Sequence, residues 1–159
     1  MQRRILALAA LSSLALGVPI AGAQGVRGVV FGGTSAQDYP VVIELSKTGR
    51  KVVRASTVLD LECLVPPDTT LPDRFRGLPI SKAGKFALTT APTRVPANPE
   101  TGAPALDVSG SIKGRVNKAR TQIKGTWQLK VVAYSPADPT NATVLDSCDS
   151  GLVAYTVKQ

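Results

Sequence analysis

Apolar and polar residues alternate through most of the chain after about residue 26, a pattern typical of β-strands. The alternation is clearest over Leu106–Val116, where the even positions are apolar or glycine and the odd positions are polar or charged. After a turn at Asn117–Arg120, the odd positions from Ile123 to Val131 are apolar or glycine. Two strands joined by a tight turn are therefore expected here, each with one face toward the core.

The glycines of this hairpin suggest how its strands pair. A two-residue loop at Lys118–Ala119 places Gly110 opposite Trp127, Ile112 opposite Gly125 and Gly114 opposite Ile123. Glycine makes room for a bulky neighbour on a sheet. We therefore interpret these glycines and Trp127 as core packing and not as a ligand platform.

Further strands follow from the same pattern. Tyr39–Ser46 and Lys51–Cys63 flank a turn in which Gly49 takes the left-handed position, and this pairing sets Ile43 opposite Val53. The remaining expected strands are Leu78–Ser81, Lys85–Thr90, Thr143–Cys148 and Leu152–Val157, and Val26–Phe31 is an optional short first strand. Irregular connections are expected near residues 32–38, 64–77, 92–104 and 135–142.

These segments predict an all-β, antiparallel fold of seven to eight strands, either a β-sandwich, which we favour, or a small closed β-barrel. The last two strands leave one ambiguity. If Leu145 and Val153 face the core, Cys148 faces outward, unless residues 149–151 form a β-bulge.

Residues 1–23 have the features of a cleaved export signal. Arg3 and Arg4 precede an apolar run, Ile5–Ile20, and Ala21–Ala23 supplies the small residues of a cleavage site. The run contains Gly17 and Pro19 and is too short for a membrane span, which needs about 20 apolar residues. Cleavage leaves residues 24–159 as one domain and predicts a secreted or otherwise extracytoplasmic location, with no transmembrane segment in the mature chain.

The two cysteines, Cys63 and Cys148, are expected to form a disulfide, because an exported chain meets oxidising conditions. Free thiols and an intermolecular link are the alternatives. The chain has no histidine. A Ser-His-Asp triad, a Cys-His pair and a histidine metal site are therefore excluded. We predict a protein that is not an enzyme and that has no cofactor or metal.

Charge gives the leading functional hypothesis. The chain carries 19 basic and 11 acidic residues, and loss of Arg3 and Arg4 leaves 17 basic residues and a net charge of +6. If successive strands run antiparallel, the three tight turns lie at one end of the domain. We call their cationic residues the basic pole: Lys47, Arg50, Lys51, Lys82, Lys85, Lys118 and Arg120.

Such a pole suits an anionic envelope polymer or an acidic extracellular protein. Lysines at turns also keep hairpins soluble and protect strand edges, so a purely solubilising role is the alternative. A nucleic-acid partner is disfavoured, because the sequence offers few aromatic residues for base stacking.

Two other functions compete with this hypothesis. The proline-rich segment 64–79 displays Arg74, Phe75 and Arg76, as the reactive loop of a secreted protease inhibitor would, although Phe75 covering the core is the simpler interpretation. A carboxylate-based hydrolase is less favoured. The outward-facing acids of the first hairpin are Glu44, Asp60 and Glu62, and the neighbouring Arg54 suggests an ordinary ion pair.

Three short motifs lie in the same order as in a group of small exported bacterial proteins that have no assigned activity. They are Asp73–Pro79 (DRFRGLP), Gly125-Thr126-Trp127 and Cys148–Gly151 (CDSG). The chain resembles this group over most of its mature length. The resemblance implies a single all-β domain and no particular site.

Overall fold

The computed structural model describes residues 28–135 and 143–159, which form ten β-strands and no helix. The predicted signal, residues 1–23, and the connection at 136–142 lie outside the described residues. The strands are β1 (Val29–Ser35), β2 (Pro40–Leu45), β3 (Lys51–Cys63), β4 (Thr69–Pro79), β5 (Lys85–Thr89), β6 (Thr93–Val95), β7 (Ala105–Val116), β8 (Gln122–Tyr134), β9 (Val144–Asp149) and β10 (Val153–Lys158).

The all-β prediction is confirmed, whereas the expected count of seven to eight strands is too low. Two segments that were expected to be irregular belong to strands. Residues 69–77 lengthen the strand expected at Leu78 into β4, along the outer edge of β3, and residues 93–95 form the additional strand β6 beside β7.

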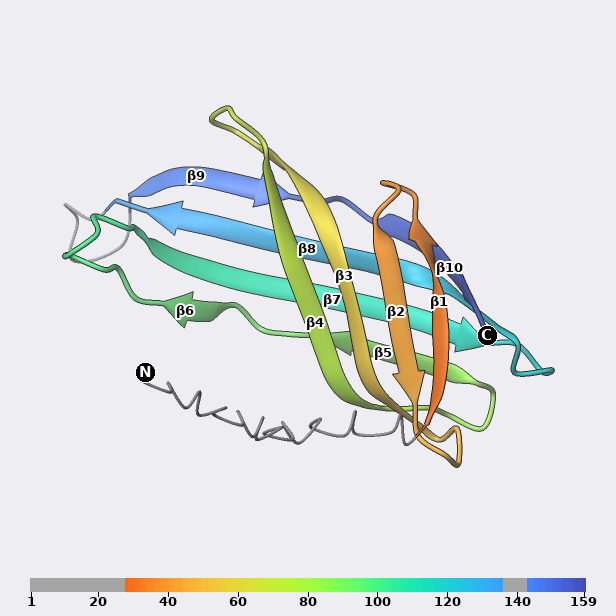
Figure 1. Cartoon of the computed structure of the whole chain (residues 1–159). Coiled ribbons are helices and arrows are strands. Elements are labelled where there is room, and N and C mark those ends of the chain that lie inside the picture. Colours follow the sequence, from red (N-terminus) through yellow and green to blue (C-terminus); the bar gives the residue numbers. More distant parts are fainter. Residues whose placement is uncertain (1–27, 136–142) are drawn as a thin grey trace, which may run out of the picture.

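Antiparallel pairing closes a ring of six strands in the order β10–β1–β2–β3–β9–β8, with β8 paired back to β10. The other four strands extend this barrel: β4 pairs with β3, β7 pairs with β8, and β5 and β6 pair with β7. Figure 1 shows β1–β4 as one layer that crosses the long strands β7 and β8 at a large angle. The core lies between these two crossing layers.

The ring can close because the long strand β8 pairs with two short strands, one after the other along its length. β8 pairs with β10 along Gln122–Trp127 and with β9 along Lys130–Tyr134. Asp149 lies opposite Lys130, and Val153 lies opposite Trp127. Four residues from Asp149 to Val153 therefore span the same length of sheet as three residues of β8, from Lys130 to Trp127. The extra residue is a β-bulge, where Gly151 has a φ of 63°.

This bulge resolves the ambiguity at the second cysteine. Cys148 faces the core and is 8% exposed, whereas Leu145 is 47% exposed, which settles the orientation that the sequence left open. Cys148 lies directly opposite Cys63 of β3, and the predicted disulfide joins them with a Cα–Cα distance of 4.1 Å. The bridge therefore fixes the short contact between β3 and β9.

The register of both predicted hairpins differs from the expectation by two residues. In the β7–β8 hairpin, Ile112 lies opposite Trp127 and Gly114 opposite Gly125. The loop has four residues and not two, because the Asn117 carboxamide oxygen accepts hydrogen bonds from the backbone amides of residues 121 and 122. In a similar way, Ile43 of β2 lies opposite residue 55, and the expected partner, Val53, is an extra residue of a bulge and is 40% exposed.

Aromatic rings fill the core, and glycines give them room. Trp127 is buried as predicted, and its indole N–H donates a hydrogen bond of 2.7 Å to the Asp73 carboxylate of the opposite layer. A Cβ on Gly110 would lie 3.1 Å from the Phe75 ring, and one on Gly114 would overlap the Phe86 ring. The packing interpretation of the glycines therefore holds, but the rings they accommodate come from other strands than predicted.

Candidate anion-binding surface

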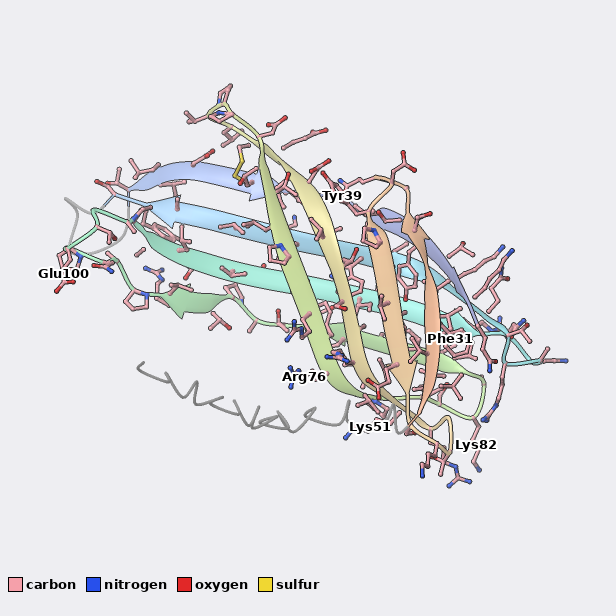
Figure 2. All side chains as sticks on the ribbon, viewed as in Figure 1. Phe31, Tyr39, Lys51, Arg76, Lys82 and Glu100 are labelled. Atoms are coloured by element: carbon pink, nitrogen blue, oxygen red, sulfur yellow. A yellow bond between two sulfur atoms is a disulfide. The ribbon has the colours of Figure 1, made fainter. Side chains whose placement is uncertain are left out.

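The structure brings the three basic turns together at one end of the molecule. The Arg120 guanidinium of the β7–β8 turn donates a hydrogen bond of 3.2 Å to the Thr48 carbonyl of the β2–β3 turn. Next to it, the Ile80 amide of the β4–β5 connection donates to the Arg50 carbonyl at 2.8 Å. Figure 2 shows Lys51 and Lys82 at this end and Glu100 at the opposite end. The residues of the basic pole therefore share one surface.

Gly49 favours the contact between two of these turns. Its φ of 64° is the left-handed conformation expected from the sequence, which glycine adopts without steric cost. In addition, a Cβ at Gly49 would overlap the Arg120 guanidinium. Arg120 itself has a φ of 56°. The backbone conformations of the two turns thus favour the hydrogen bond between the Arg120 guanidinium and the Thr48 carbonyl.

No acid of the described residues neutralises the basic pole. The three ion pairs in these parts of the chain are Arg54–Glu44, Arg94–Asp107 and Lys130–Asp149, none of which involves the pole. Segments 46–51, 81–85 and 113–124 contain no acidic side chain, and all seven cations of the pole are exposed. Their positive field therefore extends into solvent.

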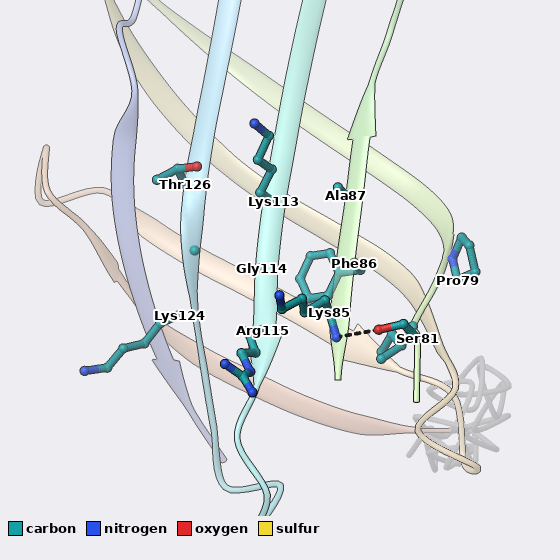
Figure 3. Close-up of a pocket in the computed structure, with 12 residues that line it drawn as sticks. Pro79, Ser81, Lys85, Phe86, Ala87, Lys113, Gly114, Arg115, Lys124 and Thr126 are labelled. Carbon is teal, nitrogen blue, oxygen red and sulfur yellow. Dashed lines mark hydrogen bonds between the residues drawn. The ribbon is translucent and has the colours of Figure 1, made fainter. Parts of the chain in front are cut away.

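A groove of about 770 Å³ lies beside these turns, on the outer face of β5, β7 and β8. Four basic side chains line it, together with two hydroxyl side chains and an apolar bed (Figure 3). The lining residues are Pro79, Ile80, Ser81, Lys85, Phe86, Ala87, Lys113, Gly114, Arg115, Lys124, Gly125 and Thr126.

Three of the four cations are aligned across neighbouring strands. Lys85 lies opposite Arg115 in the β5–β7 pair, and Arg115 lies opposite Lys124 in the β7–β8 pair. Adjacent strands are about 4.8 Å apart, and like charges directly opposite one another are destabilising. Lys113 lies two residues along β7 from this row. The sequence analysis found only Lys85 of these four, although all of them occupy the outward positions of their strands.

The candidate protein-binding loop at 64–79 is for the most part a strand. Arg74, Phe75 and Arg76 lie in β4, which pairs with β3 from Lys51 to Leu61. Phe75 is 5% exposed and packs on Trp127 with ring centroids 5.3 Å apart, while the two arginines are exposed. The expectation of a displayed loop is therefore corrected, because Phe75 is needed in the core and its backbone completes a sheet.

The acidic residues of the first hairpin do not face one another as a catalytic pair. Glu44 forms the expected ion pair with Arg54, with a distance of 3.5 Å between Oε2 and Nη2. Asp60 accepts hydrogen bonds from the hydroxyls of Tyr39 and Thr70. These carboxylates hold neighbouring segments together.

A cluster that the sequence analysis missed ties β6 to β7 and β8. Arg94 donates two hydrogen bonds to Asp107 and stacks over the Tyr134 ring at 4.4 Å, and the Tyr134 hydroxyl also donates to Asp107. The hydrogen bond from Arg94 lowers the pKa of Asp107, and the bond to Asp107 raises the pKa of Tyr134. The cluster is far along the sheet from the basic pole, and we interpret it as structural.

Asp149 of the CDSG motif, and Asp146 just before the motif, are also held by internal partners. Partial burial opposes ionisation of Asp149, but hydrogen bonds from Lys130, Gln128 and the Gly151 amide outweigh it and lower its pKa. The Asp146 carboxylate lies within 4.8 Å of both cysteine sulfurs, which are joined in the disulfide and so are not thiolate ligands. Nothing in this arrangement indicates a metal site.

No protein-family description, curated protein or solved structure matches the chain. In residues 28–135 and 143–159, no helix is long and apolar enough to cross a membrane. The function must therefore be inferred from the surface of the molecule.

Proposed function

We propose that this protein is a non-catalytic binding module that acts outside the cytoplasm and attaches through its basic pole to an anionic polymer. The observation that carries the proposal is the convergence of three turns whose cations have no acidic partner in the described residues. The disulfide and the signal-like residues 1–23 support the location.

The energetic argument depends on the number of charges. A single exposed ion pair contributes only about 0–1 kcal/mol. Several cations on one surface create a combined field that attracts a polyanion and accelerates its association. A polymer also contacts many of these cations at once, so weak contacts add up along its length. The extent of the pole therefore suits a repeating anion better than a single one.

The structure offers little support for the competing functions. Arg74 and Arg76 flank a buried phenylalanine in a paired strand, which gives an inhibitor no displayed loop at these residues. The Glu44 carboxylate is engaged with Arg54, and the Asp60 carboxylate is engaged with Tyr39 and Thr70.

Co-sedimentation of the oxidised mature protein with purified envelope material tests the proposal. Between about 0.1 M and about 1 M salt the Debye length falls from about 10 Å to about 3 Å, so binding by exposed charges should weaken steeply. Binding that is insensitive to salt would contradict attachment through the pole, and absence of binding at low salt would refute the envelope hypothesis.

A charge-matched pair of variants locates the contact. Lys47→Glu with Lys118→Glu changes two pole residues that make no ion pair, and it leaves Arg120 in place because Arg120 holds the turns together. Arg74→Glu with Arg76→Glu changes the net charge equally on β4. Binding should fall at least tenfold in the first variant and much less in the second. Equal losses in both would show that net charge alone, and not the pole, governs attachment.

A further inference from the structure

The groove beside the basic pole has features of a selective site, beyond those of a generally positive surface. Its four cations and two hydroxyl side chains are all hydrogen-bond donors, and no carboxylate is among its lining residues. Hydroxyls can also accept, but the ammonium and guanidinium groups cannot. The ligand that such a lining suits is rich in acceptor oxygens and carries more than one negative charge.

The aligned row of cations gives the strongest indication of a bound anion. Lys85, Arg115 and Lys124 are directly opposite one another on three neighbouring strands, without an intervening acid. This arrangement destabilises the free protein and is relieved when an anion lies across the row. The planar guanidinium at the centre of the row presents two parallel N–H groups, which match two oxygens of a phosphate.

The apolar bed of the groove indicates that carbon atoms connect the charged groups of the ligand. Pro79, Ile80 and Ala87 supply apolar surface beside the cations. Apolar surface favours the carbon atoms of the ligand. The volume, about 770 Å³, suits a segment of a chain better than a single inorganic ion.

We propose that this groove selects phosphate-bearing polymers over carboxylate-bearing polymers. A phosphate monoester offers three terminal oxygens to a lining that consists of donors, whereas a carboxylate offers two, and its tetrahedral shape reaches cations on more than one strand. This inference rests on the proposed function and deepens it: the turns of the basic pole attract polyanions of any kind, and the groove distinguishes among them.

The test compares two probes with the same carbon backbone, matched in length and total charge, dextran phosphate and carboxymethyl dextran, by calorimetric titration of the oxidised protein. Dextran phosphate should bind at least tenfold more tightly than carboxymethyl dextran. The variant Ala87→Glu places an acid in the bed of the groove at an exposed position and should remove this preference. Its matched control is Thr89→Glu, which adds the same charge two residues along the same face of β5, outside the groove, and should retain the preference.

The outcomes separate this inference from the proposed function. Equal affinity of the unmodified protein for both probes, or a preference that survives Ala87→Glu, would overturn the selective groove while leaving polyanion binding intact. Failure of both probes to bind at low salt would overturn the proposed function itself. Lys47→Glu with Lys118→Glu should weaken binding of both probes by a similar factor and leave their ratio unchanged.

Discussion

Gly114 of β7 lies opposite Gly125 of β8, and the space above this pair is occupied by the rings of Phe86 and Tyr155. A methyl group added at Gly114 would overlap the end of the Phe86 ring and lie 2.5 Å from the Tyr155 hydroxyl oxygen. We therefore predict that Gly114→Ala destabilises the protein, although an alanine ordinarily favours a strand over glycine.

The magnitude follows from two opposing effects. Overpacking a core costs about 1–3 kcal/mol, and overlap with two rings places Gly114→Ala in the upper half of this range. Alanine also restricts the unfolded chain, which returns about 0.4–1 kcal/mol of stability. The free energy of unfolding should therefore fall by about 1–2 kcal/mol, which lowers Tm by about 4–8 °C for a domain of this size.

Two comparisons make the measurement specific, each by thermal unfolding followed by circular dichroism. Gly110→Ala is the control, because its methyl would lie 3.1 Å from the Phe75 ring and 3.3 Å from the Asp73 carboxylate, so Tm should change by only about 2 °C or less. Phe86→Leu should be less harmful in the Gly114→Ala background than in the unmodified protein, by about 1 kcal/mol. An unchanged Tm for Gly114→Ala, or equal effects of Phe86→Leu in both backgrounds, would refute this account of the packing.

Two further predictions concern the disulfide and the acid sensitivity of the fold. Cys63 and Cys148 are 85 positions apart, and replacing both by alanine removes the cross-link that closes this loop. The free energy of unfolding, measured by urea denaturation, should fall by about 4–5 kcal/mol. A loss below about 1 kcal/mol would contradict the chain-entropy estimate. Because the pKa of Asp107 is lowered in the folded state by Arg94, its contribution is present above the ordinary carboxyl pKa of about 3.9 and is lost as the pH falls through the folded pKa. Asp107→Asn should therefore lower Tm at pH 6 and have little effect near pH 2.5, and a difference in Tm that does not vary with pH would argue against this ion pair.

Properties that depend on local pattern were predictable from the sequence. Alternation identified the buried faces of β7 and β8, including Trp127, and the turn at Gly49 was expected in its left-handed conformation. Antiparallel succession placed the three basic turns at one end, since that inference needs only the order of strands and turns. The disulfide was expected from two cysteines in a chain with a predicted export signal.

Properties that depend on exact register were not predictable. With the expected two-residue loop, Lys124 would lie opposite Lys113; the four-residue loop places it opposite Arg115, whose other neighbour is Lys85. The aligned row of three cations therefore depends on a carboxamide of Asn117 that bonds to backbone amides. Most of β4 was expected to be irregular, because Pro66 and Pro67 precede it and Pro72 and Pro79 lie within it, but an edge strand tolerates proline.

The closed ring of strands also sets the order in which the protein can fold. β10, the last strand of the described chain, lies between β1, the first, and β8, and it pairs residues as distant as Gly33 and Val157. Contacts of such sequence separation make folding slow. Until residues 153–158 have been synthesised, one edge of β1 and half an edge of β8 lack their partner and are open to pairing with other chains. The ring is thus completed only after nearly the whole chain is available, and truncations near its end should favour aggregation over a smaller folded domain.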